Sequence, residues 1–137
     1  MDNPKILVAN TGEDSLFLKD KKESKTINLK KLLKEYENSF QESEQLGPYD
    51  MVLGEKDIVY ITNSYDNSIM KIDIENDRLL KYIKVGRNPT CIRKFNGKIY
   101  IANSDSNSIS VVDEESFSLI EDIAVGEKPT DIEIDEE

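Results

Sequence analysis

Short runs that alternate apolar and polar residues recur along this chain, and polar turn residues separate them. In the middle of the chain the alternation predicts strands at residues 58–62, 68–72, 79–85 and 90–95. The segments between them are rich in Asn, Asp, Ser and Gly, which are turn residues. Asn96-Gly97 is typical of a two-residue hairpin turn. No helical pattern occurs within this stretch, so the sequence predicts a unit of four short antiparallel strands.

This unit recurs after forty positions. Residues 57–96 and 97–136 share 16 identical residues without a gap. A period of this length indicates stacked copies of one supersecondary unit. Four antiparallel strands in about forty residues is the size of one blade of a β-propeller. We therefore expect an all-β chain of about three blades.

A third copy, residues 5–47, lies at the N-terminus. The ten-residue spacing from Asn10 to Asp20 equals those from Asn63 to Asp73 and from Asn103 to Asp113. From Asp20 to the next proline, Pro48, there are 28 residues, against 16 from Asp73 to Pro89 and from Asp113 to Pro129. The first copy therefore contains an insertion of 12 residues.

The insertion, at about residues 29–46, has a helical rather than a strand pattern. Its apolar residues follow helical spacing, with Lys and Glu between them: Leu29, Leu32, Leu33, Tyr36 and Phe40. Asn28 is a suitable N-cap, and Gly47-Pro48 is expected to end the helix. Such a helix either packs on the propeller as a stabilising lid or shapes a pocket for a ligand or partner.

Tyr60-Ile61-Thr62-Asn63, Tyr100-Ile101-Ala102-Asn103 and Leu7-Val8-Ala9-Asn10 resemble the signature of the YVTN-repeat (YncE-like) β-propellers. The Ser-Ile-x-x-x-Asp and Val-Gly-x-x-Pro elements that follow fit the same repeat. The resemblance covers most of the chain outside residues 21–46. It implies four-stranded blades around a central channel. It also makes the repeated residues structural: Asn10, Asn63, Asn103, Asp20, Asp73, Asp113, Pro48, Pro89 and Pro129.

The chain begins and ends out of phase with its blades. Residues 5–10 correspond to the second strand of a blade, and residues 130–134 are expected to form the first strand of another. Closed propellers have about four to eight blades. Two interpretations are open. The chain is the N-terminal part of a longer propeller, or two chains join head to tail and complete each other as a six-bladed ring.

The net charge and its distribution along the chain limit the possible partners. The net charge is −10, which argues against a duplex nucleic-acid binder because phosphate contacts need clustered Lys and Arg. Residues 19–34 nevertheless contain seven Lys and two acids, whereas the chain from Asp113 onward contains eleven acids and one Lys. These segments are either solvated surfaces or two faces that attract across a dimer seam.

Other features exclude whole classes of function. No apolar leader follows Met1 and no run reaches transmembrane length, which favours a cytoplasmic or spore-associated protein without a signal peptide. Cys91 is the single cysteine, so no internal disulfide forms. The absence of His excludes a His-based triad within this chain. We therefore expect no bound metal or other cofactor and no catalytic residue.

One candidate ligand site emerges from the repeat. Asp50, Cys91 and Asp131 each lie two residues after a blade's proline, and the first strand lines the channel, so they are expected to ring its mouth. Arg87 lies in a loop on the same face. Acidic groups there could bind a cation or an amine; the alternative is ordinary polarity of turns and channel.

The function that the sequence predicts is a non-catalytic binding or interaction scaffold with an unknown protein or small molecule on this face. The fold analogy alone supports it. A lactonase-like propeller hydrolase and a structural component of a spore or cell envelope are the alternatives.

Overall fold

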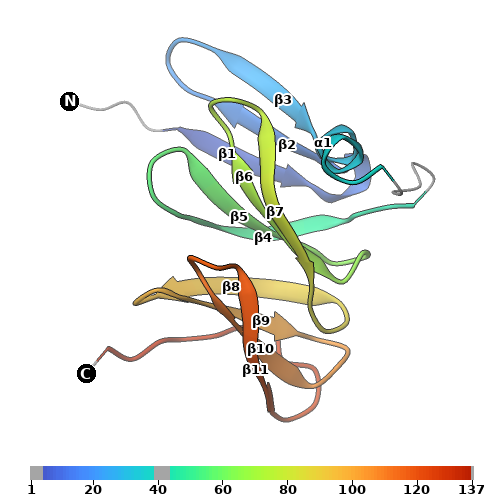
Figure 1. The fold of residues 1–137 in the computed structure, drawn as a ribbon, viewed down its shortest axis with the longest axis vertical. Coiled ribbons are helices and arrows are strands. Elements are labelled where there is room, and N and C mark those ends of the chain that lie inside the picture. Colours follow the sequence, from blue (N-terminus) through green and yellow to red (C-terminus); the bar gives the residue numbers. More distant parts are fainter. Residues whose placement is uncertain (1–4, 39–43, 137) are drawn as a thin grey trace.

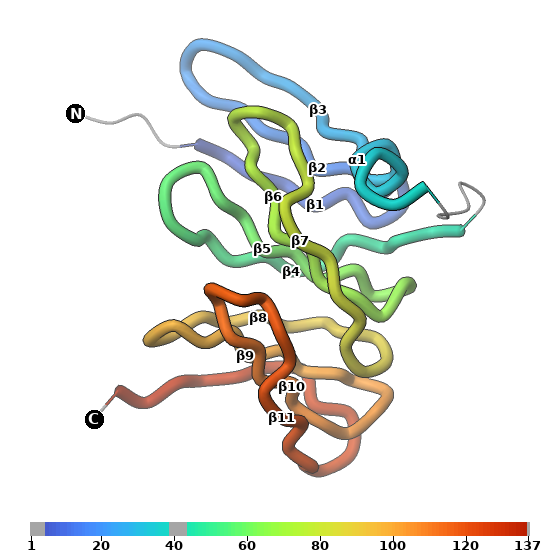
Figure 2. Tube along the Cα trace, viewed as in Figure 1, coloured from blue at the N-terminus to red at the C-terminus, as the bar shows by residue number. Residues whose placement is uncertain are grey.

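A computed structural model describes residues 5–38 and 44–136, and it contains three antiparallel sheets stacked side by side (Figure 1). The stacking of the sheets confirms the all-β propeller prediction. Figure 2 shows that the N-terminal and C-terminal sheets lie at opposite ends of the long axis of the molecule. In the described ranges, no helix has the length and apolar character needed to cross a membrane.

Blade one has three strands among the described residues: β1 (Ile6–Asn10), β2 (Ser15–Lys19) and β3 (Ser24–Asn28), with the short helix η1 (Thr11–Glu13) between the first two. The sheet order β1-β2-β3 places β1 at one edge, and β1 pairs only with β2 among the strands that the structure describes. By its position in the repeat, β1 is a second strand, so the described residues of this sheet include no first strand.

Blades two and three each have four strands in sequence order. Blade two contains β4 (Pro48–Leu53), β5 (Ile58–Asn63), β6 (Ser68–Asp73) and β7 (Arg78–Lys84). Blade three contains β8 (Pro89–Phe95), β9 (Lys98–Asn103), β10 (Ser108–Asp113) and β11 (Ser118–Ala124). The predicted hairpin joins β8 to β9, and both Asn96 and Gly97 have the positive φ values, 51° and 79°, that such a turn requires.

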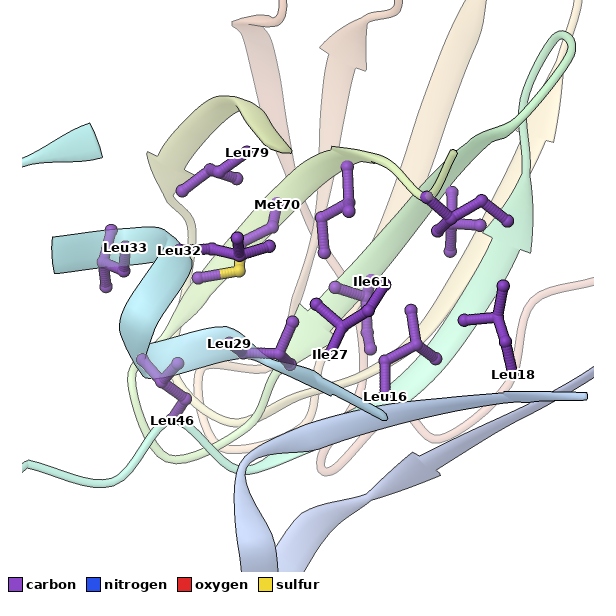
Figure 3. Close-up of a cluster of buried hydrophobic side chains, with 13 residues drawn as sticks. Leu16, Leu18, Ile27, Leu29, Leu32, Leu33, Leu46, Ile61, Met70 and Leu79 are labelled. Atoms are coloured by element: carbon purple, nitrogen blue, oxygen red, sulfur yellow. The ribbon is translucent and has the colours of Figure 1, made fainter. Parts of the chain in front are cut away.

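Two apolar clusters hold the blades together. The cluster between blades one and two includes Leu16, Leu18, Ile61, Met70 and Ile72 (Figure 3). The cluster between blades two and three includes Tyr60, Ile69, Ile92, Ile99 and Ile101. Alternate residues of β5 therefore face opposite neighbours, as the period of two along a strand requires. Blade two, which lies between the other two blades, is therefore apolar on both sides.

The insertion forms helix α1 (Leu29–Tyr36), and Asn28 caps it as predicted because its side chain accepts a hydrogen bond from the Lys31 N–H at 3.1 Å. Leu29, Leu32 and Leu33 are buried in the first cluster (Figure 3). The predicted end at Gly47-Pro48 is wrong: Glu37 is extended and ends the helix. Tyr36 is 45% exposed rather than packed, and Phe40 lies outside the described residues.

Asp14 binds both ends of this insertion. Its carbonyl accepts the Leu29 N–H at 3.0 Å, and its carboxylate accepts the N–H groups of Leu46 and Gly47 at 3.1 and 2.8 Å. Gly47 has a φ of +70°, and a Cβ there would meet the Tyr65 ring at 2.6 Å. The insertion therefore leaves the propeller and returns to it at one point.

The predicted strand at residues 130–134 is not observed; residues 129–136 have no assigned secondary structure. A strand needs a paired neighbour, and none of the described segments pairs with this tail. The tail is nevertheless anchored, since the Pro129 carbonyl accepts a hydrogen bond from Ser104 Oγ at 2.7 Å.

Candidate functional site

The connections that follow the second and fourth strands of each blade form one face of the molecule, here called the loop face. A hydroxyl in each second-to-third-strand connection donates to the carbonyl of the proline that begins the next blade. The three bonds are Thr11 to Pro48 (2.6 Å), Ser64 to Pro89 (2.6 Å) and Ser104 to Pro129 (2.7 Å). This repeated bond fixes where each first strand starts.

The repeated Asn residues lie at the ends of the second strands, next to these bonds. Each donates through Nδ2 to the Ser that begins the third strand: Asn10 to Ser15 (3.4 Å), Asn63 to Ser68 (3.1 Å) and Asn103 to Ser108 (3.1 Å). Asn63 and Asn103 are fully buried. These contacts brace the turn on the loop face, which is a structural role.

The repeated Asp residues lie on the opposite face, where the third strand turns into the fourth. The carboxylates of Asp20, Asp73 and Asp113 accept backbone N–H groups two or three residues ahead, at 2.8–3.2 Å. These hydrogen bonds lower the pKa of each carboxyl group; the largest cause is the Glu23 backbone for Asp20, the Asn76 side chain for Asp73 and the Ser116 backbone for Asp113. They cap turns, away from any ligand site on the loop face.

The structure links Asp50, Cys91 and Asp131 through a residue that the sequence did not single out. Arg93 donates from Nη1 to Asp50 Oδ2 at 3.1 Å and from Nη2 to Asp131 Oδ1 at 2.9 Å. Asp50 Oδ2 also accepts the Ile92 N–H at 3.1 Å. A guanidinium therefore joins one carboxylate from β4 of blade two to another from the tail after blade three. Asp50, Cys91, Arg93 and Asp131 together are called the Arg93 cluster below.

Arg93 lies two positions after Cys91 on β8, so strand alternation places both on one side. That signal was available in the sequence. The repeat comparison concealed it because the equivalent positions hold Val52 and Glu133, which are not basic.

The Cys91 thiol is 1% exposed and lies 3.6 Å from Asp131 Oδ1. Burial raises the pKa of this thiol to about 11, while the Arg93 charge opposes the rise. The thiol is therefore protonated at neutral pH, and only the thiolate is an effective nucleophile.

Arg87 lies apart from the cluster. Its Nη2 donates to the Asp105 carbonyl at 2.9 Å, and its backbone N–H donates to Ser106 Oγ at 2.7 Å. Arg87 therefore braces the connection between blades two and three against the β9–β10 loop, so the structure does not bring the four predicted site residues together.

The charge of Arg93 also changes the chemistry expected at the channel mouth. A cation would have to compete with a guanidinium that already contacts both carboxylates. Among residues 5–38 and 44–136, no group of three His, Cys, Asp or Glu residues has the arrangement that could hold a metal ion.

The opposite face has an open depression of about 540 Å³ between blades two and three, which the sequence did not indicate. Tyr60, Ile58, Lys71, Glu55 and Glu114 contribute to its lining. Tyr60 donates to Glu114 Oε2 at 2.9 Å and stacks on Phe117 with ring centroids 5.9 Å apart. Burial and this carboxylate raise the pKa of the Tyr60 hydroxyl, so the pair acts as a fixed brace between two blades.

No family model matches this chain, and no curated protein matches it. Solved structures do. Virginiamycin B lyase from Staphylococcus aureus is 12% identical with a TM-score of 0.70, over 93% of this chain and 40% of that one. AztD from Citrobacter koseri is 20% identical with a TM-score of 0.67, over 89% and 33%. The WD40 β-propeller domain of Doa1 is 15% identical with a TM-score of 0.68, over 88% and 36%.

The chain therefore spans well under half the length of each of these structures. Identities of 12–20% show the fold alone. The stacked sheets and these neighbours together establish a β-propeller architecture.

Proposed function

We propose that this chain is part of a YVTN-type β-propeller that acts as a non-catalytic binding scaffold, with the Arg93 cluster as its ligand contact. The observation that carries the proposal is the exposure of the cluster: the Arg93 side chain is 41% exposed and that of Asp131 is 75% exposed. A fixed donor and a fixed acceptor thus lie beside each other in reach of solvent. They suit a small ligand, or a side chain of a partner, that carries a charged hydrogen-bonding group.

The assignment to the YVTN type rests on how the repeated residues are used. The signature Asn binds the Ser five positions later in all three blades. The hydroxyl residue after that Asn binds the next blade's proline carbonyl in all three as well. The first contact needs the Asn and the Ser that the repeat specifies, and the second recurs at equivalent positions in all three blades, which supports a shared repeat rather than a chance resemblance.

The thiol and the carboxylates of the cluster are poorly suited to catalysis. The raised pKa keeps Cys91 protonated, and the chain contains no His to act as its base. Asp50 Oδ2 and Asp131 Oδ1 each accept a hydrogen bond from Arg93, so these oxygens are already engaged by a fixed donor. These features favour binding over hydrolysis. A cytoplasmic or spore-associated location is part of the same proposal, and a fluorescent fusion would test it.

The test is an NMR titration of the full chain with three probes: putrescine as a diamine, succinate as a dicarboxylate and L-lysine as a zwitterion. We expect at least one probe to shift the backbone amide signals of Ile92, Arg93 and Ile132. Asp131→Asn should weaken the binding of putrescine or L-lysine about tenfold, because it removes the carboxylate that an ammonium group would contact (~1.4 kcal/mol); it should not weaken the binding of succinate, whose carboxylates would contact Arg93. Arg87→Ala, on the same face but outside the cluster, should leave the binding of every probe unchanged.

The alternative is a hydrolase, so the same protein is also assayed with dihydrocoumarin, a simple lactone. If the wild-type chain hydrolyses the lactone and Asp131→Asn or Arg93→Lys abolishes this activity, the hydrolase replaces the binding scaffold as the proposed function. No response of the three amides to any probe would show that the cluster is only a structural brace.

A further inference from the structure

The tail after blade three is held where the first strand of a further blade begins. Ser104 Oγ donates to the Pro129 carbonyl at 2.7 Å, just as Ser64 donates to Pro89 at the start of β8. Asn107 Oδ1 accepts the Lys128 N–H at 3.0 Å, as Asn67 Oδ1 accepts that of Asn88 at 2.9 Å. The tail thus has the position of a first strand, and no described strand of this chain pairs with it.

Blade one is the reverse, a sheet whose described residues include no first strand. Within the described residues, no strand lies on the side of β1 away from β2. Ile6 and Val8 on this edge strand are 56% and 40% exposed. An unpaired edge strand with exposed apolar side chains is a template for pairing with another chain.

From these two features we infer that a second copy of this chain is the partner: residues 129–135 of each copy pair antiparallel with β1 of the other. This interface does not require the Arg93 cluster to bind a ligand, but Asp131 belongs to both.

The repeat also gives the register of this pairing. In blade three β8 pairs with β9 as Cys91 with Ala102, Ile92 with Ile101 and Lys94 with Ile99, and β4 pairs with β5 in the same register. Transferring this register to the tail and β1 gives the pairs Pro129 with Asn10, Asp131 with Ala9, Ile132 with Val8, Glu133 with Leu7, Ile134 with Ile6 and Asp135 with Lys5 of the partner. Ile132 and Ile134 meet Val8 and Ile6, and Asp135 meets Lys5, whereas Asp131 and Glu133 fall opposite Ala9 and Leu7 on the other side of the strand.

The faces of the outer blades match each other in the same way. Ile99 and Ile101 of blade three pack on the blade-two cluster, and their counterparts in blade one are the exposed Ile6 and Val8. The blade-two residues Ile83 and Val85 pack against that cluster, and their counterparts in blade three, Ile123 and Val125, are 42% and 40% exposed. Each open face of one copy therefore presents the residues that the opposite open face needs.

Charge favours the same partner. The tail belongs to the acidic end of the chain, with eleven acids from Asp113 onward, whereas residues 19–34 of blade one carry seven Lys and two acids. Two copies placed head to tail bring the acidic blade three of one next to the Lys-rich blade one of the other, where Lys25 already pairs with Asp77 of its own blade two at 2.8 Å and Lys30 with its own Asp14 at 3.4 Å. A self-pairing of like ends would set acid against acid.

Site-directed crosslinking tests the register. In the full chain with Cys91→Ser, one sample carries Ile6→Cys and a second carries Ile134→Cys. We expect a covalent dimer when the two are mixed under mild oxidation, and at least tenfold less when either is oxidised alone. The matched control pairs Ile6→Cys with Glu133→Cys, one position away and on the opposite side of the strand, and it should crosslink at least tenfold less.

Light scattering on a size-exclusion column tests the assembly without added cysteines. The wild-type chain should elute at twice the mass of one chain. Val8→Glu should shift it to the mass of one chain, whereas Leu119→Glu, at an exposed position of β11 outside both pairing edges, should remain a dimer. Circular dichroism checks that each variant is folded.

The inference would be overturned by a folded wild-type monomer, by a polymer that grows with concentration instead of a closed dimer, or by equal crosslinking of the matched and shifted cysteine pairs. A wild-type dimer with no crosslink at Ile6 and Ile134 would show that the copies meet on another surface.

Discussion

The seam between blades two and three and the open side of blade three contain the same residues in different surroundings. Ile69 is fully buried at the seam, whereas Ile109, forty positions later, is only half-buried. A Cβ on Gly86 would meet Asn103 at 2.6 Å, whereas a Cβ on Gly126 would meet nothing within 4 Å. Each blade therefore has an apolar side that is buried only when another blade packs against it.

The largest expected effect separates the two isoleucines. Ile69→Ala should lower the free energy of unfolding by about 2–5 kcal/mol, because it leaves a cavity in a packed cluster. Ile109→Ala should cost less than half as much in the single chain, since part of its side chain already contacts water. Urea denaturation at low protein concentration measures both. Equal losses would show that the side of blade three is already covered.

The two glycines make a sharper comparison because their own chemistry is identical. Gly86→Ala forces a methyl group against the buried Asn103 side chain and should cost about 1–3 kcal/mol. Gly126→Ala should leave the stability of the single chain unchanged. The substitution should lower the melting temperature only as protein concentration rises. In a dimer, Asn10 of the partner would contact Gly126 in the way that Asn103 contacts Gly86. Thermal unfolding at several concentrations measures this, and a concentration-independent loss for Gly126→Ala would contradict the comparison.

The smallest effect concerns the turn carboxylates, which do not depend on a neighbouring blade. Folding lowers the pKa of Asp20, Asp73 and Asp113 from the usual 3.8. Their contribution to stability is therefore present above about pH 4 and is lost as the pH falls through the lower folded values. Replacing all three with Asn should reduce the loss of unfolding free energy between about pH 5 and 2, which urea denaturation at each pH measures. An unchanged loss would show that other groups cause it.

The strands of the repeat were predictable because turn chemistry and alternation are local signals. The start of α1 was also predictable, since Asn28 caps it with its own side chain. Its end was not: Gly47-Pro48 marks only an outer limit, and the chain leaves the helix at Glu37 once Leu29, Leu32 and Leu33 are buried.

The remaining errors have one physical origin, which is contact between blades. Residues 130–134 have the pattern of a strand, but a strand forms only beside a partner. Asp50, Cys91 and Asp131 were found because they occupy equivalent positions in the repeat. Arg93 was missed because the residues at its equivalent positions are not basic. Its two ion pairs reach strand positions about forty residues away on either side.

The attachment of the insertion to Asp14 has a consequence for how such a chain can change length. Because one residue binds Leu29 at the start and Leu46 and Gly47 at the end, the blades keep the same boundary whatever the length of the segment between α1 and Leu46, provided that α1 still buries Leu32 and Leu33. Lengthening a closed loop costs only about 0.6 kcal/mol per doubling. The point is therefore a natural place for evolution, or for an engineer, to graft a longer segment or a whole domain without disturbing the propeller.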